Sequence, residues 1–211
     1  MMRIGLGMVF CALLATSGLA GEQTSFDHLH PGQSSSPPIG WVQFCRENPG
    51  ECSTGEMRAR SVTLDNVRWQ ELVRVNLAYN RSIRAVTDQE QYGLMENWTY
   101  ATTGRGDCED YVLEKRRALI ARGWPVSALL ITVVLDKEGG GHAVLTVMTD
   151  RGEFVLDNQT DTILRWSESG LTFIKRQAPT NENRWVDLGR VLGNRETLTA
   201  GLRSVHVKPS R

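Results

Sequence analysis

The sequence predicts an α+β domain in which N-terminal helices pack on an antiparallel β-sheet. Three observations support this prediction. The chain has 211 residues, enough for one domain with a substantial core. Apolar residues recur at helical spacing in two segments that end near residue 121, and β-branched, apolar runs separated by turn residues follow from residue 127. Helices first and hairpin-connected strands afterwards are typical of α+β rather than alternating α/β folds.

The N-terminus has the three parts of a secretory signal peptide. Arg3 supplies a positive charge, residues 4–14 are mostly apolar, and small residues precede a cleavage point after Ala20. Residues 1–20 are therefore predicted to be a signal peptide, with export of the mature chain. Residues 21–40 are polar and contain a Ser-Pro run, which predicts a flexible leader. Residues 41–211 are predicted to form a single domain.

The charge composition gives no indication of a nucleic-acid partner. Lysine and arginine number 24, aspartate and glutamate also number 24, and no basic run interrupts this balance. Nucleic-acid-binding domains concentrate positive charge in a patch or stripe. The composition therefore argues against a DNA- or RNA-binding protein.

The first predicted helix runs from about residue 65 to Val86. Thr63 or Asp65 can cap its N-terminus. Apolar residues then recur every three to five positions, as an amphipathic helix requires. These residues are Leu64, Val67, Leu72, Val75, Tyr79, Ile83 and Val86.

A second helix is predicted to begin just after Asp107. Asp107 is a suitable N-cap, and Asp110 stands three residues on, as in a capping box. Residues 111–121 alternate apolar and basic side chains at helical spacing, and acids first with bases last suit the helix dipole. Gly123 and Pro125 end the helix.

The strands follow in hairpin order. Residues 127–135, 142–149 and 154–157 are apolar or β-branched and are separated by turn-rich segments. Residues 163–166 and 171–174 are weaker candidates for strands. Residues 194–211 show no clear pattern. An antiparallel meander after the second helix is therefore expected.

The cysteine count indicates one free thiol. Cys11 would leave with the signal peptide, so three cysteines remain in the mature chain. Cys45 and Cys52 flank a short loop with a Pro-Gly turn, which favours a disulfide between them in an oxidising compartment. Cys108 is then left over, and an odd cysteine in a secreted protein is a candidate reactive thiol. An intermolecular disulfide or an inert, buried thiol are the alternatives.

Cys108, His142 and Asp157 are the candidate catalytic residues. Cys108 stands at the first turn of a predicted helix, where the helix dipole is expected to lower its pKa. His142 begins one strand and Asp157 ends the next, so the fold can bring all three together. Cys108 would act as nucleophile, His142 as base and then acid, and Asp157 as the group that orients the imidazole. Asn158 is an alternative orienting residue, and each residue alone would more often have a structural role.

Several motifs resemble the bacterial transglutaminase-like cysteine proteinases, a family that includes the LapG-type periplasmic proteases. They are WVQFC at 41–45, GDCEDY at 106–111, GHAVL at 141–145 and VLDN at 155–158, with Asn76 and Lys115 between them. The resemblance spans about residues 41–185. It implies a papain-like, transglutaminase-like core, and it places Cys108, His142 and Asp157 on the catalytic triad of the family.

The resemblance also implies calcium. Its ligands would be the acids that flank the cysteine, Asp107 and Glu109, with Asp110 as a further candidate. Carboxylates are the hard oxygen ligands that Ca²⁺ takes, although Asp107 and Asp110 could also cap the helix without a metal. The sequence departs from the family pattern just after Trp98. Trp98 is more often a core residue than an oxyanion donor, and the backbone N–H of Cys108 is the expected donor.

The function implied is a calcium-dependent periplasmic cysteine endopeptidase. LapG-type relatives cut large surface adhesins, release cells from biofilms and are held in check by an inner-membrane cyclic-di-GMP receptor. Two alternatives stay open from the sequence. A transglutaminase-type acyltransferase would share the triad and the acyl-enzyme, and a non-catalytic binding domain could keep the fold.

Overall fold

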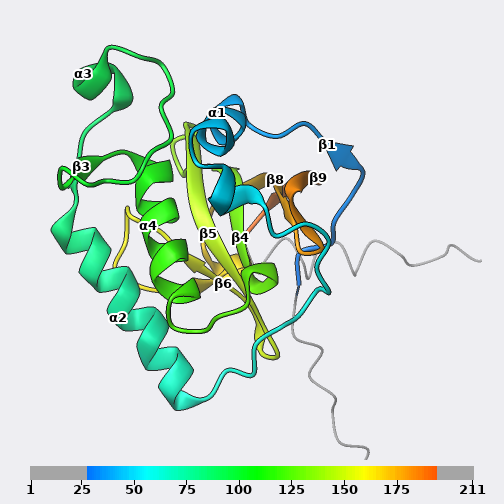
Figure 1. Ribbon diagram of the computed structural model, residues 1–211. Coiled ribbons are helices and arrows are strands. Elements are labelled where there is room, and N and C mark those ends of the chain that lie inside the picture. The colour runs from blue at the N-terminus through cyan, green and yellow to red at the C-terminus, as the bar shows by residue number, and fades with distance from the viewer. Residues whose placement is uncertain (1–27, 194–211) are drawn as a thin grey trace, which may run out of the picture.

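The computed structural model describes residues 28–193 of the chain. Its centre is a seven-stranded antiparallel sheet in the order β1-β9-β8-β4-β5-β6-β7 (Figure 1). The strands are β1 (Ser34–Ser35), β4 (Leu129–Leu135), β5 (Gly141–Thr149), β6 (Gly152–Leu156), β7 (Leu164–Arg165), β8 (Thr172–Ala178) and β9 (Asn181–Leu192). The predicted α+β class with an antiparallel meander is confirmed.

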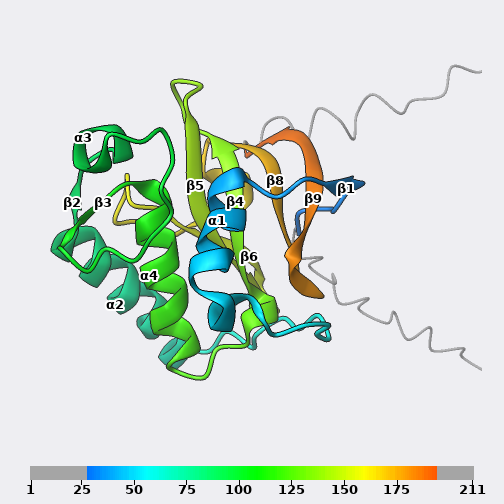
Figure 2. The same cartoon turned by 45° about the horizontal axis from the view of Figure 1, so that its top comes forward.

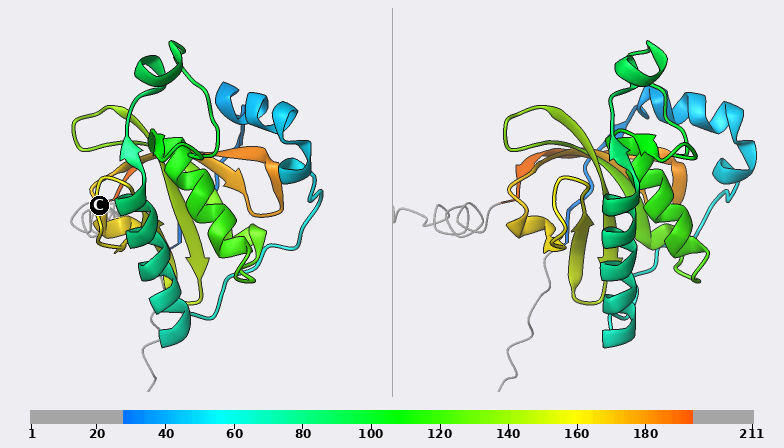
Figure 3. Two further views of the ribbon diagram at one scale, coloured as in Figure 1. Left: turned by 60° about the vertical axis from the view of Figure 1, so that its left-hand side comes forward. Right: turned by 90° about the vertical axis from the view of Figure 1, so that its left-hand side faces the viewer.

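Helices cover one face of this sheet. Helix α4 (Cys108–Ile120) lies against β5, and α2 (Asn66–Ser82) runs alongside α4 on its outer side (Figures 1 and 3). Helix α1 (Ile39–Glu47) lies on the other side of α4 (Figure 2). The short α3 (Asp88–Tyr92) and a two-stranded parallel ribbon, β2 (Arg84–Ala85) with β3 (Arg105–Gly106), lead into α4. Three short 3₁₀ turns complete the fold at Pro49–Cys52, Val126–Ala128 and Trp166–Glu168.

Alternation along the strands produces two cores, one on each face of the sheet. In β5, Ala143 and Leu145 face the helices, and Val144 faces the other way. The helix-side core also contains Trp41, Leu72 and Leu119. The opposite core contains Leu29, Val134, Val155, Trp166 and Phe173. Both faces are therefore buried, which explains why β4 and β5 are almost continuously apolar.

The predicted flexible leader over residues 21–40 is wrong for the part that the structure describes. Leu29 is 3% exposed, and Ser34–Ser35 form the edge strand β1 on β9. Gly32 N–H donates to the Asp187 carbonyl at 2.8 Å, which anchors the segment before β1. The domain therefore begins before residue 41. Residues 1–27, with the predicted signal peptide, and residues 194–211 lie outside the described residues.

The starts of helices α2 and α4 agree with the prediction, but the end of α2 is set by strand pairing. Asp65 caps α2 by accepting a hydrogen bond from Arg68 N–H, as one of the two predicted caps. The helix ends at Ser82 rather than near Val86, because Arg84 and Ala85 pair with β3. Helix α4 begins where it was predicted, but the capping box is absent, since the Asp107 side chain makes no capping bond.

The disulfide prediction is confirmed. Cys45 and Cys52 are joined, with their Cα atoms 5.6 Å apart, and Cys108 is a free cysteine. The bond ties the end of α1 to the following 3₁₀ turn. Across residues 28–193, none of the helices combines the length and the apolar character needed to cross a bilayer.

Candidate active site

Cys108 stands at the first residue of α4, between two acids. The parallel pairing of β2 with β3 fixes the chain just before it, and Val86 N–H donates to the Gly106 carbonyl at 3.0 Å. A side chain at position 106 would meet the Asp110 carboxylate, with a Cβ only 2.4 Å from Oδ2, so glycine is required there. These constraints place the half-buried thiol beside the N-terminal end of β5, where His142 lies.

His142 and Asp157 are paired across neighbouring strands. His142 Nε2 lies 2.8 Å from Asp157 Oδ1, and Gln159 N–H donates to the same oxygen at 2.9 Å. Burial would raise the pKa of Asp157, but the hydrogen bond and charge of His142 outweigh it and hold the pKa below its ordinary value. Asp157 thus stays ionised and fixes the Nε2–H tautomer of His142, which leaves Nδ1 as the ring nitrogen for Cys108. Asp157, and not Asn158, is the residue bonded to His142.

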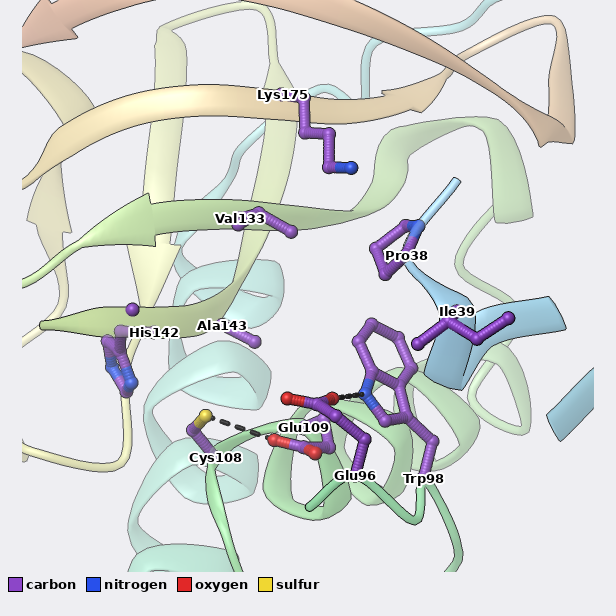
Figure 4. Close-up of a pocket in the computed structure, with 11 residues that line it drawn as sticks. Pro38, Ile39, Glu96, Trp98, Cys108, Glu109, Val133, His142, Ala143 and Lys175 are labelled. Atoms are coloured by element: carbon purple, nitrogen blue, oxygen red, sulfur yellow. Dashed lines mark hydrogen bonds between the residues drawn. The ribbon is translucent and has the colours of Figure 1, made fainter. Parts of the chain in front are cut away.

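Cys108 and His142 line the same cavity, of about 360 Å³ (Figure 4). The Ala143 backbone amide of β5 lies near the Cys108 sulfur and acts to lower the pKa of the thiol. The remaining wall comes from Trp98, Glu96, Pro38 and Ile39. A nucleophile, its base and an orienting carboxylate are thereby brought together at an accessible cleft.

The thiol does not have the lowered pKa that its helix position predicts. Burial raises the pKa of Cys108 well above its ordinary value, and the nearby Glu109 carboxylate adds to the rise. Cys108 Sγ lies 3.1 Å from Glu109 Oε2, to which it donates. Desolvation and an adjacent anion disfavour the thiolate more than the helix N-terminus favours it.

Three carboxylates form a cluster next to Cys108. Ligand oxygens of Asp88, Asp107 and Glu109 all lie within 4.8 Å of one another. Burial and the Asp107 charge raise the pKa of Glu109 to about 9, and burial also raises the pKa of Asp107 and Asp88. Asp107 Oδ1 is buried without a hydrogen-bond partner. This set of hard, mutually repelling oxygens fits a divalent cation such as Ca²⁺, which would neutralise the acids beside the thiol.

The carboxylate cluster differs from the predicted ligand set at two positions. Asp110 is not one of the three clustered acids; its Oδ1 accepts a hydrogen bond from Thr99 N–H at 2.9 Å, and its Oδ2 is buried without a hydrogen-bond partner. It therefore supports the loop before α4. Asp88 takes its place in the cluster, and its backbone N–H donates to Asp107 Oδ2 at 3.2 Å. No local motif marks Asp88, because only the β2–β3 pairing brings it to residue 107 from 19 positions away.

Helix α2 holds the loop that follows Asp157. Asn80 Nδ2 donates to the Asp157 carbonyl at 3.0 Å and to the Thr160 carbonyl at 3.1 Å. Asn76, which is fully buried, donates to the Asp161 carbonyl at 3.2 Å. These amides supply hydrogen bonds to carbonyls that the turn after β6 leaves without strand partners.

Trp98 has the core position that was expected and also borders the cleft. It is 4% exposed and packs edge-on against Trp41. Its indole N–H donates to Glu96 at 2.9 Å. The backbone N–H of Cys108, in the first turn of α4, has no acceptor within its own helix. It therefore remains the better placed donor for an oxyanion.

A free cysteine at a helix start, with a His–Asp pair on adjacent strands, defines a cysteine hydrolase of the papain-like type. Comparison with known families agrees with this class. The sequence model of the bacterial transglutaminase-like cysteine proteinase family matches residues 31–192 of this chain. The chain belongs to this family, and it is a cysteine peptidase.

Solved structures of one protein resemble this fold. Calcium-bound Legionella pneumophila LapG is 24% identical, with a TM-score of 0.51 over 66% of this chain and 82% of that one. EGTA-treated LapG from the same organism is 26% identical over 64% and 76% of the two chains, with a TM-score of 0.49. A third LapG structure is 24% identical over 67% and 77%, with a TM-score of 0.49. No curated protein matches the chain.

Proposed function

We propose that this protein is a calcium-dependent periplasmic endopeptidase that cleaves a large cell-surface adhesin and so controls attachment in biofilms. The observation that carries the proposal is the junction of two sites through three consecutive residues. Cys108 faces His142 in the cleft, while its neighbours Asp107 and Glu109 belong to the carboxylate cluster. Binding of a cation to the carboxylate cluster would therefore change the charge and position of the residues on either side of Cys108.

The peptidase chemistry follows from the paired residues. His142 Nδ1 takes the proton of Cys108 as the sulfur attacks the scissile carbonyl, and Asp157 stabilises the imidazolium that forms. The same proton passes to the leaving amine, and the acyl group remains on sulfur as a thioester. Water, deprotonated by His142, then attacks the thioester and releases the acid and the thiol.

Calcium is proposed as the cation of the cluster. Asp88, Asp107 and Glu109 would hold it, and it would supply the positive charge that these buried carboxylates lack. Two further observations support this choice. The raised pKa values of Asp107 and Glu109 indicate an anionic site without compensation. In addition, LapG of the same fold has been solved in calcium-bound and EGTA-treated forms.

The substrate and the compartment rest on the resemblance to LapG-type periplasmic proteases. A secretory signal over residues 1–20 would deliver the chain to the periplasm. An inner-membrane cyclic-di-GMP receptor is the proposed regulator, and a large adhesin is the proposed substrate. The cleft fits a polypeptide, since it is open and borders both apolar and charged side chains.

The test is incubation of the purified protein with the exported adhesins of the same cell. We expect one defined cut in the presence of calcium, none with a chelator, and none with the variant Cys108→Ala. A labelled amine added to the same reaction separates hydrolysis from acyl transfer. Amine incorporation that outpaces hydrolysis, or a cut that survives the chelator, would contradict the proposal.

A further inference from the structure

Three side chains form a row across the sheet that leads away from Cys108. In the strand register, Ala143 of β5 lies opposite Val133 of β4, and Val133 lies opposite Lys175 of β8. Directly paired residues of antiparallel strands point to the same face of the sheet. All three line the cavity that contains Cys108 and His142, and Figure 4 shows them in this order.

The other wall of the cavity is mainly apolar. It consists of Trp98, Pro38 and Ile39, with Glu96 bonded to the Trp98 indole, and Ile39 is 61% exposed. A polypeptide between this wall and the row would cross β5, β4 and β8 in turn. The cavity is thus a channel with the nucleophile at one end and Lys175 at the other (Figure 4).

Charge changes sign along this channel. Glu109 lies beside Cys108, where the proposed calcium would offset its charge, and Glu96, beside Trp98, supplies negative charge toward the reactive end (Figure 4). Lys175 supplies positive charge at the far end. An acidic substrate side chain would be repelled near Cys108 and attracted near Lys175.

Lys175 is held in place but lacks an opposite charge. Its Nζ donates one hydrogen bond, to the Ser36 carbonyl at 2.9 Å. An ammonium group has three protons, so two remain for another acceptor. Within residues 28–193, no carboxylate forms an ion pair with Lys175. Burial lowers the pKa of this lysine, as expected for a cation without a compensating anion.

We infer that Lys175 is a specificity-determining residue that selects an aspartate or glutamate side chain of the substrate. The inference deepens the proposed function and rests on its peptidase activity. Neighbouring strands are about 4.8 Å apart, so Lys175 lies about 10 Å from Ala143, two strands away. An extended substrate advances about 3.3 Å per residue, which places the selected acid about three residues from the scissile bond.

The test uses the calcium-loaded full chain and a library of peptides from a digested bacterial proteome, with the cuts identified by mass spectrometry. The wild type should cut preferentially where Asp or Glu stands at one fixed position, about three residues from the cut, on one side of it. The charge-reversal variant Lys175→Glu should lose that preference and favour Lys or Arg at the same position. The shift in the acid-to-base ratio should be on the order of tenfold or more.

Two further variants make the result specific. Lys175→Gln retains an N–H donor for the Ser36 carbonyl and should abolish the preference without inverting it. Lys137→Glu reverses a charge at an exposed turn outside the channel and should leave the preference unchanged. A wild type that cuts without an acidic preference, or a Lys175→Glu variant that folds and keeps it, would overturn the inference. If the wild type cuts no peptide at all, the proposed function fails first and the inference with it.

Discussion

Two groups of buried charge, one on each face of the sheet, differ in whether they have a partner of opposite charge. On the face away from the helices, Arg176 and Glu153 form a buried ion pair that also binds both backbone groups of Leu29. On the helix face, Asp88, Asp107 and Glu109 cluster next to Cys108, and within the described part of the chain none has a cation as a partner. Charge that is paired fixes the fold, and charge that is left unpaired is available to a ligand.

The largest expected effect separates activity from stability on the helix face. Cys108→Ala removes the nucleophile, and peptidase activity should fall by about 10⁴-fold or more. The thiol is half-buried at the margin of the helix-side core, and alanine removes only its sulfur atom. The midpoint of urea unfolding should therefore stay close to that of the wild type. Turnover near the wild-type rate would remove Cys108 from the mechanism.

The opposite face should show the reverse pattern. Arg176→Ala leaves Glu153 buried without its arginine partner, and we expect a loss of about 3–5 kcal/mol in the free energy of unfolding. The peptidase activity of the folded fraction should be retained, because Arg176 does not line the cleft. Urea denaturation with activity assays at low urea measures both. A loss of activity without a loss of stability would contradict the division between the two faces.

A pH-dependent effect on stability is expected at Lys115. This residue is fully buried, and burial lowers its pKa to about 7 from an ordinary value of 10.5. Between these values the unfolded chain binds more protons than the folded one, so stability rises with pH across this window. Below about pH 7 Lys115 is charged in both states, and the stability gained at high pH is fully lost.

The matched comparison for Lys115 is Lys115→Met, which keeps the apolar stem but has no charge. The wild type should gain stability relative to this variant as pH rises from about 7 to about 10, measured by urea unfolding at each pH. The difference cancels the titration of the carboxylates, which both proteins share. A difference that does not change with pH would show that Lys115 is charged or exposed in the folded state.

The sequence predicts the parts of the site that depend on local signals. The start of α4 at Cys108, the strand of His142 and the disulfide all follow from short motifs and spacing. Asp88 could not be predicted, since its place in the cluster depends on the β2–β3 pairing. Lys175 depends in the same way on the register of three strands.

The fold shows the same division between local and tertiary signals. Buried and exposed residues do not alternate regularly along β9, so the sequence pattern does not identify this strand. Gly189 and Arg190 both have positive φ angles, which interrupt the regular strand geometry. Helix α1 was also not predicted, since Gly40 and the cysteine loop obscure its short apolar face. Gly40 is needed because Trp98 lies where its Cβ would be. Glycine at position 40 is therefore explained by packing against Trp98 and not by helix propensity.

The most direct test of the account is a calorimetric titration of calcium into the wild type, Asp107→Asn and Asp110→Asn. Both substitutions replace a buried carboxyl group near Cys108 with an amide of nearly the same shape, but only Asp107 belongs to the cluster. We predict that the wild type and Asp110→Asn bind calcium with similar affinity and that Asp107→Asn binds it at least about tenfold more weakly. Equal binding by Asp107→Asn, or a loss confined to Asp110→Asn, would contradict the assignment of the metal site and the link to the nucleophile.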